Sequence, residues 1–87
     1  QRKEEEMPET TFERVKRVIL DLNFPWATEE MITPDLNPGE HMDLAQGVDF
    51  FDKLDEEFGM ELPTRSLVDA DTLQEMVVII DQELKKD

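Results

Sequence analysis

The sequence predicts an all-α protein: a small four-helix bundle with three longer helices, one short helix and a long first loop. Three stretches carry apolar residues at intervals of three and four, which is the spacing of one helix face. Residues that favour helix N-caps precede these stretches, and prolines separate the first from the second. The 87 residues suffice for one domain, which we expect over residues 10–87, behind a flexible acidic tail at residues 1–9.

The first helix is predicted to start after Thr10 and to run to about Asn23. Thr10 and Glu13 fit a capping box, because the threonine oxygen can accept from the Glu13 amide while the glutamate reaches back. The apolar face of this helix consists of Phe12, Val15, Val18, Ile19 and Leu22.

A long loop is predicted from Phe24 to Met42. Its prolines and glycine (Pro25, Pro34, Pro38 and Gly39) exclude a long helix, although Ala27 to Met31 can form one turn. So long a loop needs buried side chains to be ordered, and the candidates are Phe24, Trp26, Ile32 and Leu36. For Trp26, packing is the favoured role and an exposed anchor for a partner is the alternative.

The second helix is predicted to start after Asp43, an N-cap with Gln46 three residues on, and to end before Gly59 in a left-handed cap. Its predicted buried stripe is Leu44, Val48, Phe51, Leu54 and Phe58, with Phe50 beside it. Gly47 lies inside the helix, where glycine costs about 1 kcal/mol relative to alanine. We therefore expect close packing or a close backbone approach at Gly47.

The third and fourth helices follow Pro63. A short helix over Thr64 to Asp69 is expected to offer Leu67 and Val68 to the core. Asp71 is the predicted cap of the last helix, whose inward residues are Leu73, Met76, Val77, Ile80 and Leu84. The β-branched run from Val77 to Ile80 favours a strand by itself, but the helical spacing outweighs it.

The formal net charge of −14 is extreme for this length. It argues against nucleic acid and anionic membranes, because binding to phosphate needs a basic footprint. It favours a protein partner with a basic docking patch, reached by electrostatic steering that salt weakens. A solvated surface without a partner explains the charge equally well.

Catalysis, metal binding and membrane insertion find little support in the sequence. Cysteine is absent, and the single histidine, His41, has no second ligand or nucleophile near it, so we expect no catalytic residue, no metal site and no enzyme activity. No apolar run approaches the ~20 residues that span a bilayer, so no membrane insertion is expected. The first residue, Gln1, suits a processed mature protein, an excised domain or part of a longer chain. The compartment stays open between a processed organellar protein and the bacterial cytoplasm.

Several segments resemble acyl carrier proteins, the phosphopantetheine-binding carrier family. They are TTFERVKRVIL, MITPDLN, LDEEFGMELP and DADTLQEMVVII, and together the resemblance covers residues 10–84 without an insertion from Asp43 onward. The resemblance implies an acyl-carrier-protein-like four-helix bundle. In that family a serine at the start of the second helix carries phosphopantetheine.

The attachment serine of the family is missing here. The second helix opens with Asp43-Leu44-Ala45, and the family register puts Leu44 in the serine position. A phosphoester requires a hydroxyl oxygen, and the only serine, Ser66, lies in the short third helix. The chain therefore resembles a divergent member without the attachment serine, and we expect no phosphopantetheine.

Without the prosthetic arm, the resemblance implies a non-catalytic interaction module, an adaptor or structural subunit of a larger assembly. Its expected partner-binding residues are Met42, Asp43, Leu44, Asp49, Asp52, Glu56 and Glu57. Phe50 is a further candidate for an apolar anchor, and Leu44 has the alternative role of capping the core. Two other functions remain open. One is an acyl or peptidyl carrier of fatty-acid or polyketide type whose serine was mutated, and the other is a protein that holds free acyl lipids between its helices.

Overall fold

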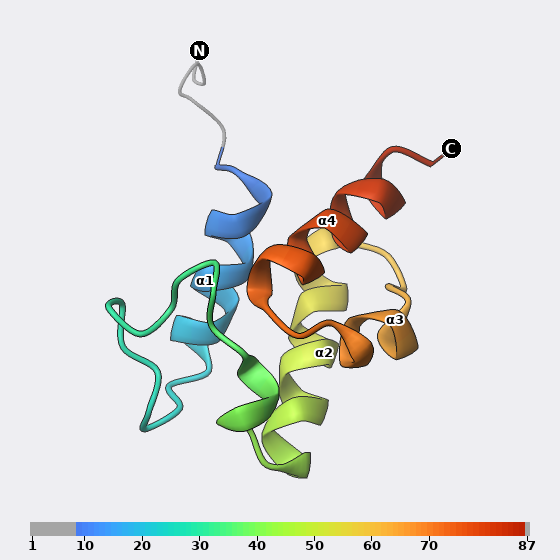
Figure 1. Cartoon of the computed structure of the whole chain (residues 1–87). Coiled ribbons are helices and arrows are strands. Elements are labelled where there is room, and N and C mark those ends of the chain that lie inside the picture. The colour runs from blue at the N-terminus through green and yellow to red at the C-terminus, as the bar shows by residue number, and fades with distance from the viewer. Residues whose placement is uncertain (1–8, 87) are drawn as a thin grey trace.

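The computed structural model describes residues 9–86, and this part of the chain is all-helical and contains no strand (Figure 1). The prediction of three longer helices and one short helix is confirmed. The predicted flexible tail at residues 1–9 lies, except for Glu9, outside the described residues. The elements are α1 (Thr11–Asp21), a 3-10 turn η1 (Pro38–Glu40), α2 (Leu44–Phe58), α3 (Thr64–Asp69) and α4 (Leu73–Leu84).

Helix α1 begins as predicted and ends slightly earlier. Thr10 Oγ1 accepts from the Glu13 amide and the Glu13 carboxylate accepts from the Thr10 amide, so the capping box is confirmed. The helix ends at Asp21, because Asn23 has a left-handed φ of 58° that cannot continue it. Asparagine is one of the few residues other than glycine that adopt this conformation readily.

Both predicted ends of α2 are confirmed. Asp43 accepts from the Gln46 amide at 2.8 Å and the Gln46 side chain accepts from the Asp43 amide, which completes a capping box. Gly59 ends the helix with φ 66° and ψ 30°. Gly47 differs from the expectation, because a β-carbon placed on it would meet nothing within 4 Å. Close packing therefore does not explain this glycine.

Alanine substitutions at these two glycines should change stability in opposite directions. Gly47→Ala should raise the free energy of unfolding by about 0.5–1 kcal/mol, because it removes a helix-interior glycine without a clash. Gly59→Ala should lower it by about 1 kcal/mol, because the left-handed φ strains any β-carbon. Urea denaturation followed by far-ultraviolet circular dichroism measures both. A destabilised Gly47→Ala protein would contradict the open space around this position.

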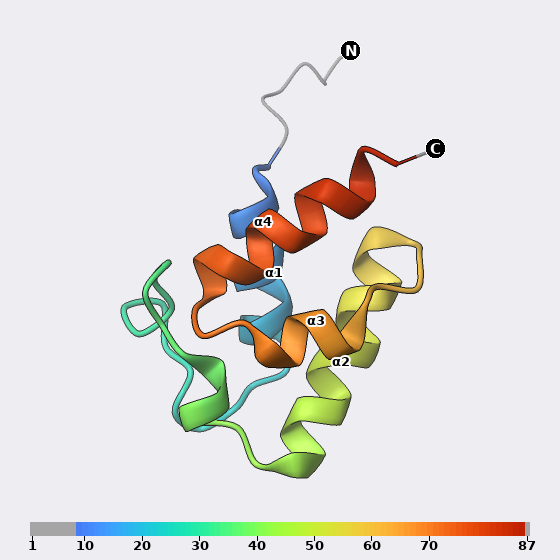
Figure 2. The same ribbon diagram turned by 45° about the vertical axis from the view of Figure 1, so that its right-hand side comes forward.

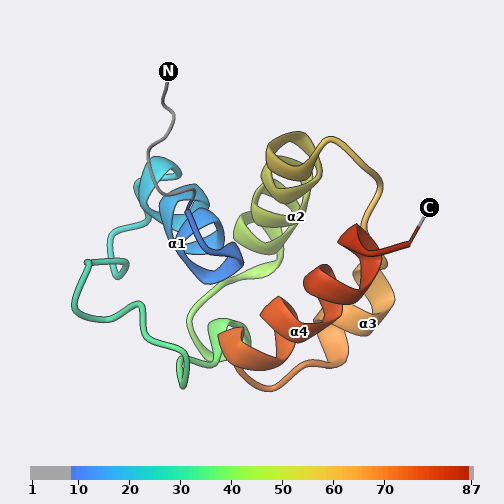
Figure 3. The same cartoon turned by 90° about the horizontal axis from the view of Figure 1, so that it is seen from above.

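The core lies where α1, α2 and α4 meet. Helix α1 contacts both α2 and α4, and the view from above shows the three helices around one centre (Figure 3). Helix α3 packs against α4, on the side of the bundle away from α1 (Figure 1, Figure 3). The completely buried side chains come from all three longer helices and include Val15, Ile19, Phe50, Leu54, Leu73 and Ile80.

The predicted buried stripe of α2 is wrong in its first two turns. Phe50, predicted to lie beside the stripe, is completely buried, whereas Leu44 is 87% exposed and Val48 is 52% exposed. The first turn of α2 extends below α1 and α4 in Figure 1, so these two helices do not cover it. The buried face therefore starts at Phe50 and continues through Leu54 and Phe58.

Smaller corrections concern α3 and α4. Leu67 is buried as predicted, but Val68 is 61% exposed and Leu84 is 38% exposed, so neither belongs to the core. The N-cap of α4 is Thr72 rather than Asp71, because the Thr72 hydroxyl accepts from the Glu75 amide. The Asp71 amide instead donates to the Glu75 carboxylate at 2.9 Å.

The long loop is tied to the bundle by its side chains and by its backbone (Figure 2). Phe24, Ile32 and Leu36 are buried, as predicted. The carbonyl oxygens of Pro34 and Leu36 accept from the amides of Gln74 and Leu73, at 3.0 and 2.9 Å. These amides begin α4 and have no acceptor within their own helix, so the loop satisfies a helix end while gaining order.

Trp26 packs on the core instead of standing exposed. It is partly buried and stacks between Phe24 and His41, with ring centroids 5.7 and 5.0 Å apart. The packing role is thus the one observed. In the segment from Ala27 to Met31, residues 28–31 form a hydrogen-bonded turn, in which the Met31 amide donates to the Thr28 carbonyl oxygen, and the segment is not a helix.

Candidate functional site

The solvent face of α2 is the candidate docking surface. Asp49, Asp52 and Glu56 are all exposed. Their spacing of three and four residues places them on one side of the helix. Within residues 9–86 none of the three forms an ion pair or a side-chain hydrogen bond, so their charges are available to a partner. We call these three residues the acidic stripe.

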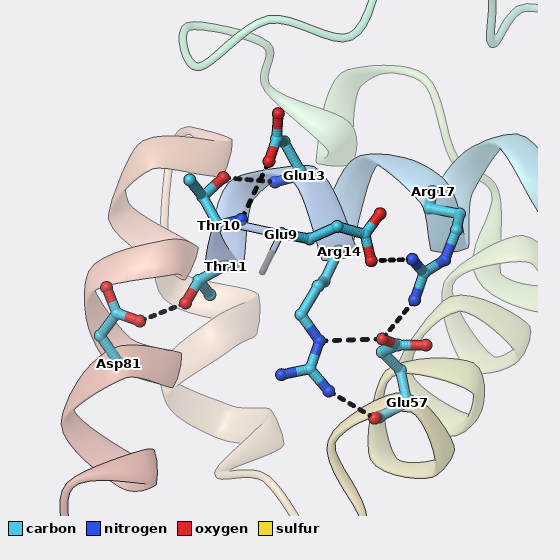
Figure 4. Close-up of polar contacts among 8 residues, drawn as sticks. All are labelled: Glu9, Thr10, Thr11, Glu13, Arg14, Arg17, Glu57 and Asp81. Carbon is cyan, nitrogen blue, oxygen red and sulfur yellow. Dashed lines mark hydrogen bonds and ion pairs between the residues drawn. The ribbon is translucent and has the colours of Figure 1, made fainter. Parts of the chain in front are cut away.

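Glu57, which the sequence assigned to the same surface, is used inside the fold (Figure 4). Arg14 Nε and Arg17 Nη2 of α1 both donate to Glu57 Oε2, at 2.9 and 2.6 Å. Arg14 Nη2 also donates to the Glu57 carbonyl oxygen at 2.9 Å, and its guanidinium lies 4.3 Å from the centre of the Phe58 ring. Glu57 therefore joins α1 to α2 and is removed from the docking surface.

The two arginines also change the titration of Glu57. The hydrogen bond from Arg14 is the main cause that lowers the pKa of the Glu57 carboxyl, partial burial opposes it, and Arg17 adds to the lowering. The last turn of α2 contains no basic residue of its own. Arg14 and Arg17 thus supply the positive charge that favours the C-terminal end of a helix. Asp55 is likewise used within the fold, because its Oδ1 accepts from the Leu62 amide at 3.0 Å.

Three of the residues predicted to bind a partner lie at or next to the start of α2. Leu44 projects into solvent, and Met42 is partly buried against the core. Asp43 is exposed but already caps the helix through its Oδ1. The suggested third anchor, Phe50, is wrong, because its side chain is completely buried. The first turn, Leu44-Ala45-Gln46-Gly47, offers no hydroxyl.

A groove of about 740 Å³ lies between α2 and α3 and reaches η1. We call it the α2–α3 groove. Such a volume lies within the usual range for ligand pockets, roughly 300–1,000 Å³. Its apolar walls include Leu44, Val48 and Phe51 on α2 and Leu67 and Val68 on α3. The lining also includes Gly47, the helix-interior glycine that close packing does not explain.

No three histidine, aspartate or glutamate side chains within residues 9–86 lie close enough to hold a metal ion. His41 is exposed and stacks on Trp26. Across the same residues, no helix combines the length and the apolar composition that a bilayer crossing requires.

Comparison with known proteins gave no relative for this chain. No protein-family model, curated protein or solved structure matches it significantly.

Proposed function

We propose that this chain is a non-catalytic, acyl-carrier-protein-like interaction module, an adaptor or structural subunit that docks a basic surface of a protein partner through α2. The observation that carries the proposal is the acidic stripe. Asp49, Asp52 and Glu56 are exposed together on one helix, while the neighbouring acids Asp55 and Glu57 are engaged in the fold.

Electrostatics and apolar contact have different roles in this docking. The net charge of −14 attracts a basic partner over a distance and raises the rate of association. Single exposed ion pairs contribute only ~0–1 kcal/mol each, so a stable complex also needs apolar contacts. Leu44, the first residue of α2, and Met42, just before the N-cap of α2, supply them.

The lost prosthetic arm is the second part of the proposal. The helix order, the capped start of α2 and the ordered first loop support an acyl-carrier-like bundle. At the attachment position, the exposed Leu44 has no oxygen to esterify. Mass spectrometry of protein from its native source should therefore find the unmodified polypeptide mass. An added phosphopantetheine would overturn this reading.

Affinity capture from the native cell extract tests the docking surface. A variant with Asp49, Asp52 and Glu56 changed to lysine should lose the partners that the wild type retains, and the wild type should release them in high salt. The matched control changes three exposed acids off α2, Glu30, Asp35 and Glu61, to lysine. Both variants have a net charge of −14 + 6 = −8. An unchanged set of partners with the α2 variant would refute the proposal.

A further inference from the structure

We infer that the α2–α3 groove binds a basic amphipathic helix of the partner, whose apolar side chains insert between α2 and α3. The inference deepens the docking function proposed above and rests on it. The groove lining contains three carboxylates, Glu40, Asp43 and Asp71, and no lysine, arginine or histidine. An apolar groove with an acidic rim complements an apolar helix face flanked by basic side chains.

Exposed apolar side chains stand on both walls of the groove. Leu44 and Val48 project from α2 and Val68 projects from α3, each at least half exposed. Apolar side chains gathered in this way on a charged surface mark an interaction site. On α2 they recur one helical turn apart and continue to Phe51. This spacing matches the anchors that one amphipathic helix presents to a groove.

Gly47 is the observation that links the groove to an occupant. It lies in the groove lining, its φ is not left-handed, and a β-carbon there would meet no atom within 4 Å. Neither packing nor backbone conformation therefore requires a glycine, although glycine weakens a helix. A bare backbone at this point lets an inserted side chain approach the wall of α2 closely.

Charge decides against two other occupants. A second copy of this chain would bring another net charge of −14 against the acidic rim. A free fatty acid would bring its carboxylate toward Glu40, Asp43 and Asp71. The basic helix is the occupant whose charge favours entry.

Binding of a designed peptide tests the inference. The probe is a fluorescein-labelled helix of roughly 15 residues, with leucines along one face and lysines and arginines on its flanks. A second peptide keeps the charges and replaces the leucines with serine. Fluorescence anisotropy should show the leucine peptide bound at least about tenfold more tightly by the wild type.

Single substitutions in α2 test whether the peptide binds in the groove or elsewhere on the helix. Gly47→Met fills the groove and should weaken binding of the leucine peptide about tenfold. Gly47→Ala should weaken it less while raising the thermal midpoint, so stability and affinity change in opposite directions. Ala45→Met is the matched control, because Ala45 is exposed on α2 outside the groove lining, and its affinity should equal that of the wild type. Circular dichroism confirms that each variant is folded.

Each contrary result overturns the inference. Equal affinity for the two peptides, no binding of either, or binding unaffected by Gly47→Met would exclude insertion into the groove. Binding of laurate that is lost in Gly47→Met, without peptide binding, would make the groove a lipid site. Sedimentation showing a wild-type dimer that Gly47→Met dissociates would assign it to a second copy. In each of these cases, affinity capture with the charge-reversed variant still tests the acidic stripe independently.

Discussion

Truncation of Leu54 to alanine is expected to lower the free energy of unfolding by about 2–5 kcal/mol, whereas the same truncation at Leu44 should change it by less than about 0.5 kcal/mol. The two leucines lie in the same helix, but Leu54 is completely buried and Leu44 is 87% exposed. The first substitution leaves a cavity among α1, α2 and α4, and the second removes a side chain that contacts mainly water.

Urea denaturation of the two variants and the wild type, followed by circular dichroism, measures this difference. A domain of this size has a total stability of only about 5–15 kcal/mol, so Leu54→Ala should remove a large fraction of it. If Leu44→Ala cost as much as Leu54→Ala, the first turn of α2 would be part of the core. In that case Leu44 would not be available as an anchor for a partner.

Replacement of Glu57 by glutamine is expected to lower the free energy of unfolding at neutral pH by about 1–2 kcal/mol. The substitution removes the negative charge that Arg14 and Arg17 share, in an interface where the Glu57 side chain is 20% exposed. This expected loss in the free energy of unfolding lies between the values for exposed ion pairs and for hydrogen bonds to buried charges, because both arginines are partly exposed to solvent.

The effect of Glu57→Gln should depend on pH. Because the fold lowers the pKa of Glu57, its contribution is fully present above the ordinary glutamate pKa of about 4.3 and is lost as the pH falls through the lower folded value. The stability difference between wild type and variant should therefore shrink below about pH 4.3. Comparing the two proteins at each pH cancels the titration of the other acids.

Glu56→Gln is the control for this experiment, because Glu56 is adjacent but exposed, and it should change stability by less than about 0.5 kcal/mol at any pH. If Glu57→Gln lowered the free energy of unfolding equally at pH 7 and below about pH 4.3, the loss would arise from hydrogen-bond geometry and not from charge. The link between α1 and α2 would then have to be described without its electrostatic part.

The acidic face of α2 shows where reasoning from the sequence succeeds and where it stops. Asp49, Asp52 and Glu56 could be assigned to the solvent face because the helix period relates them to one another. Glu57 could not be separated from them, because its partners Arg14 and Arg17 lie 43 and 40 residues away in the sequence. Helix period alone also failed to place Phe50, because the face that is buried depends on where α1 and α4 end.

The sequence by itself determined the helices and most of their ends, because a cap depends on residues at most about four positions apart. Thr10 with Glu13, Asp43 with Gln46 and the left-handed Gly59 are of this kind. The tertiary structure alone decided which acids are free, which leucine is exposed and that a groove opens beside Gly47. These features depend on how segments distant in the chain pack together, and no local pattern of residues encodes that packing.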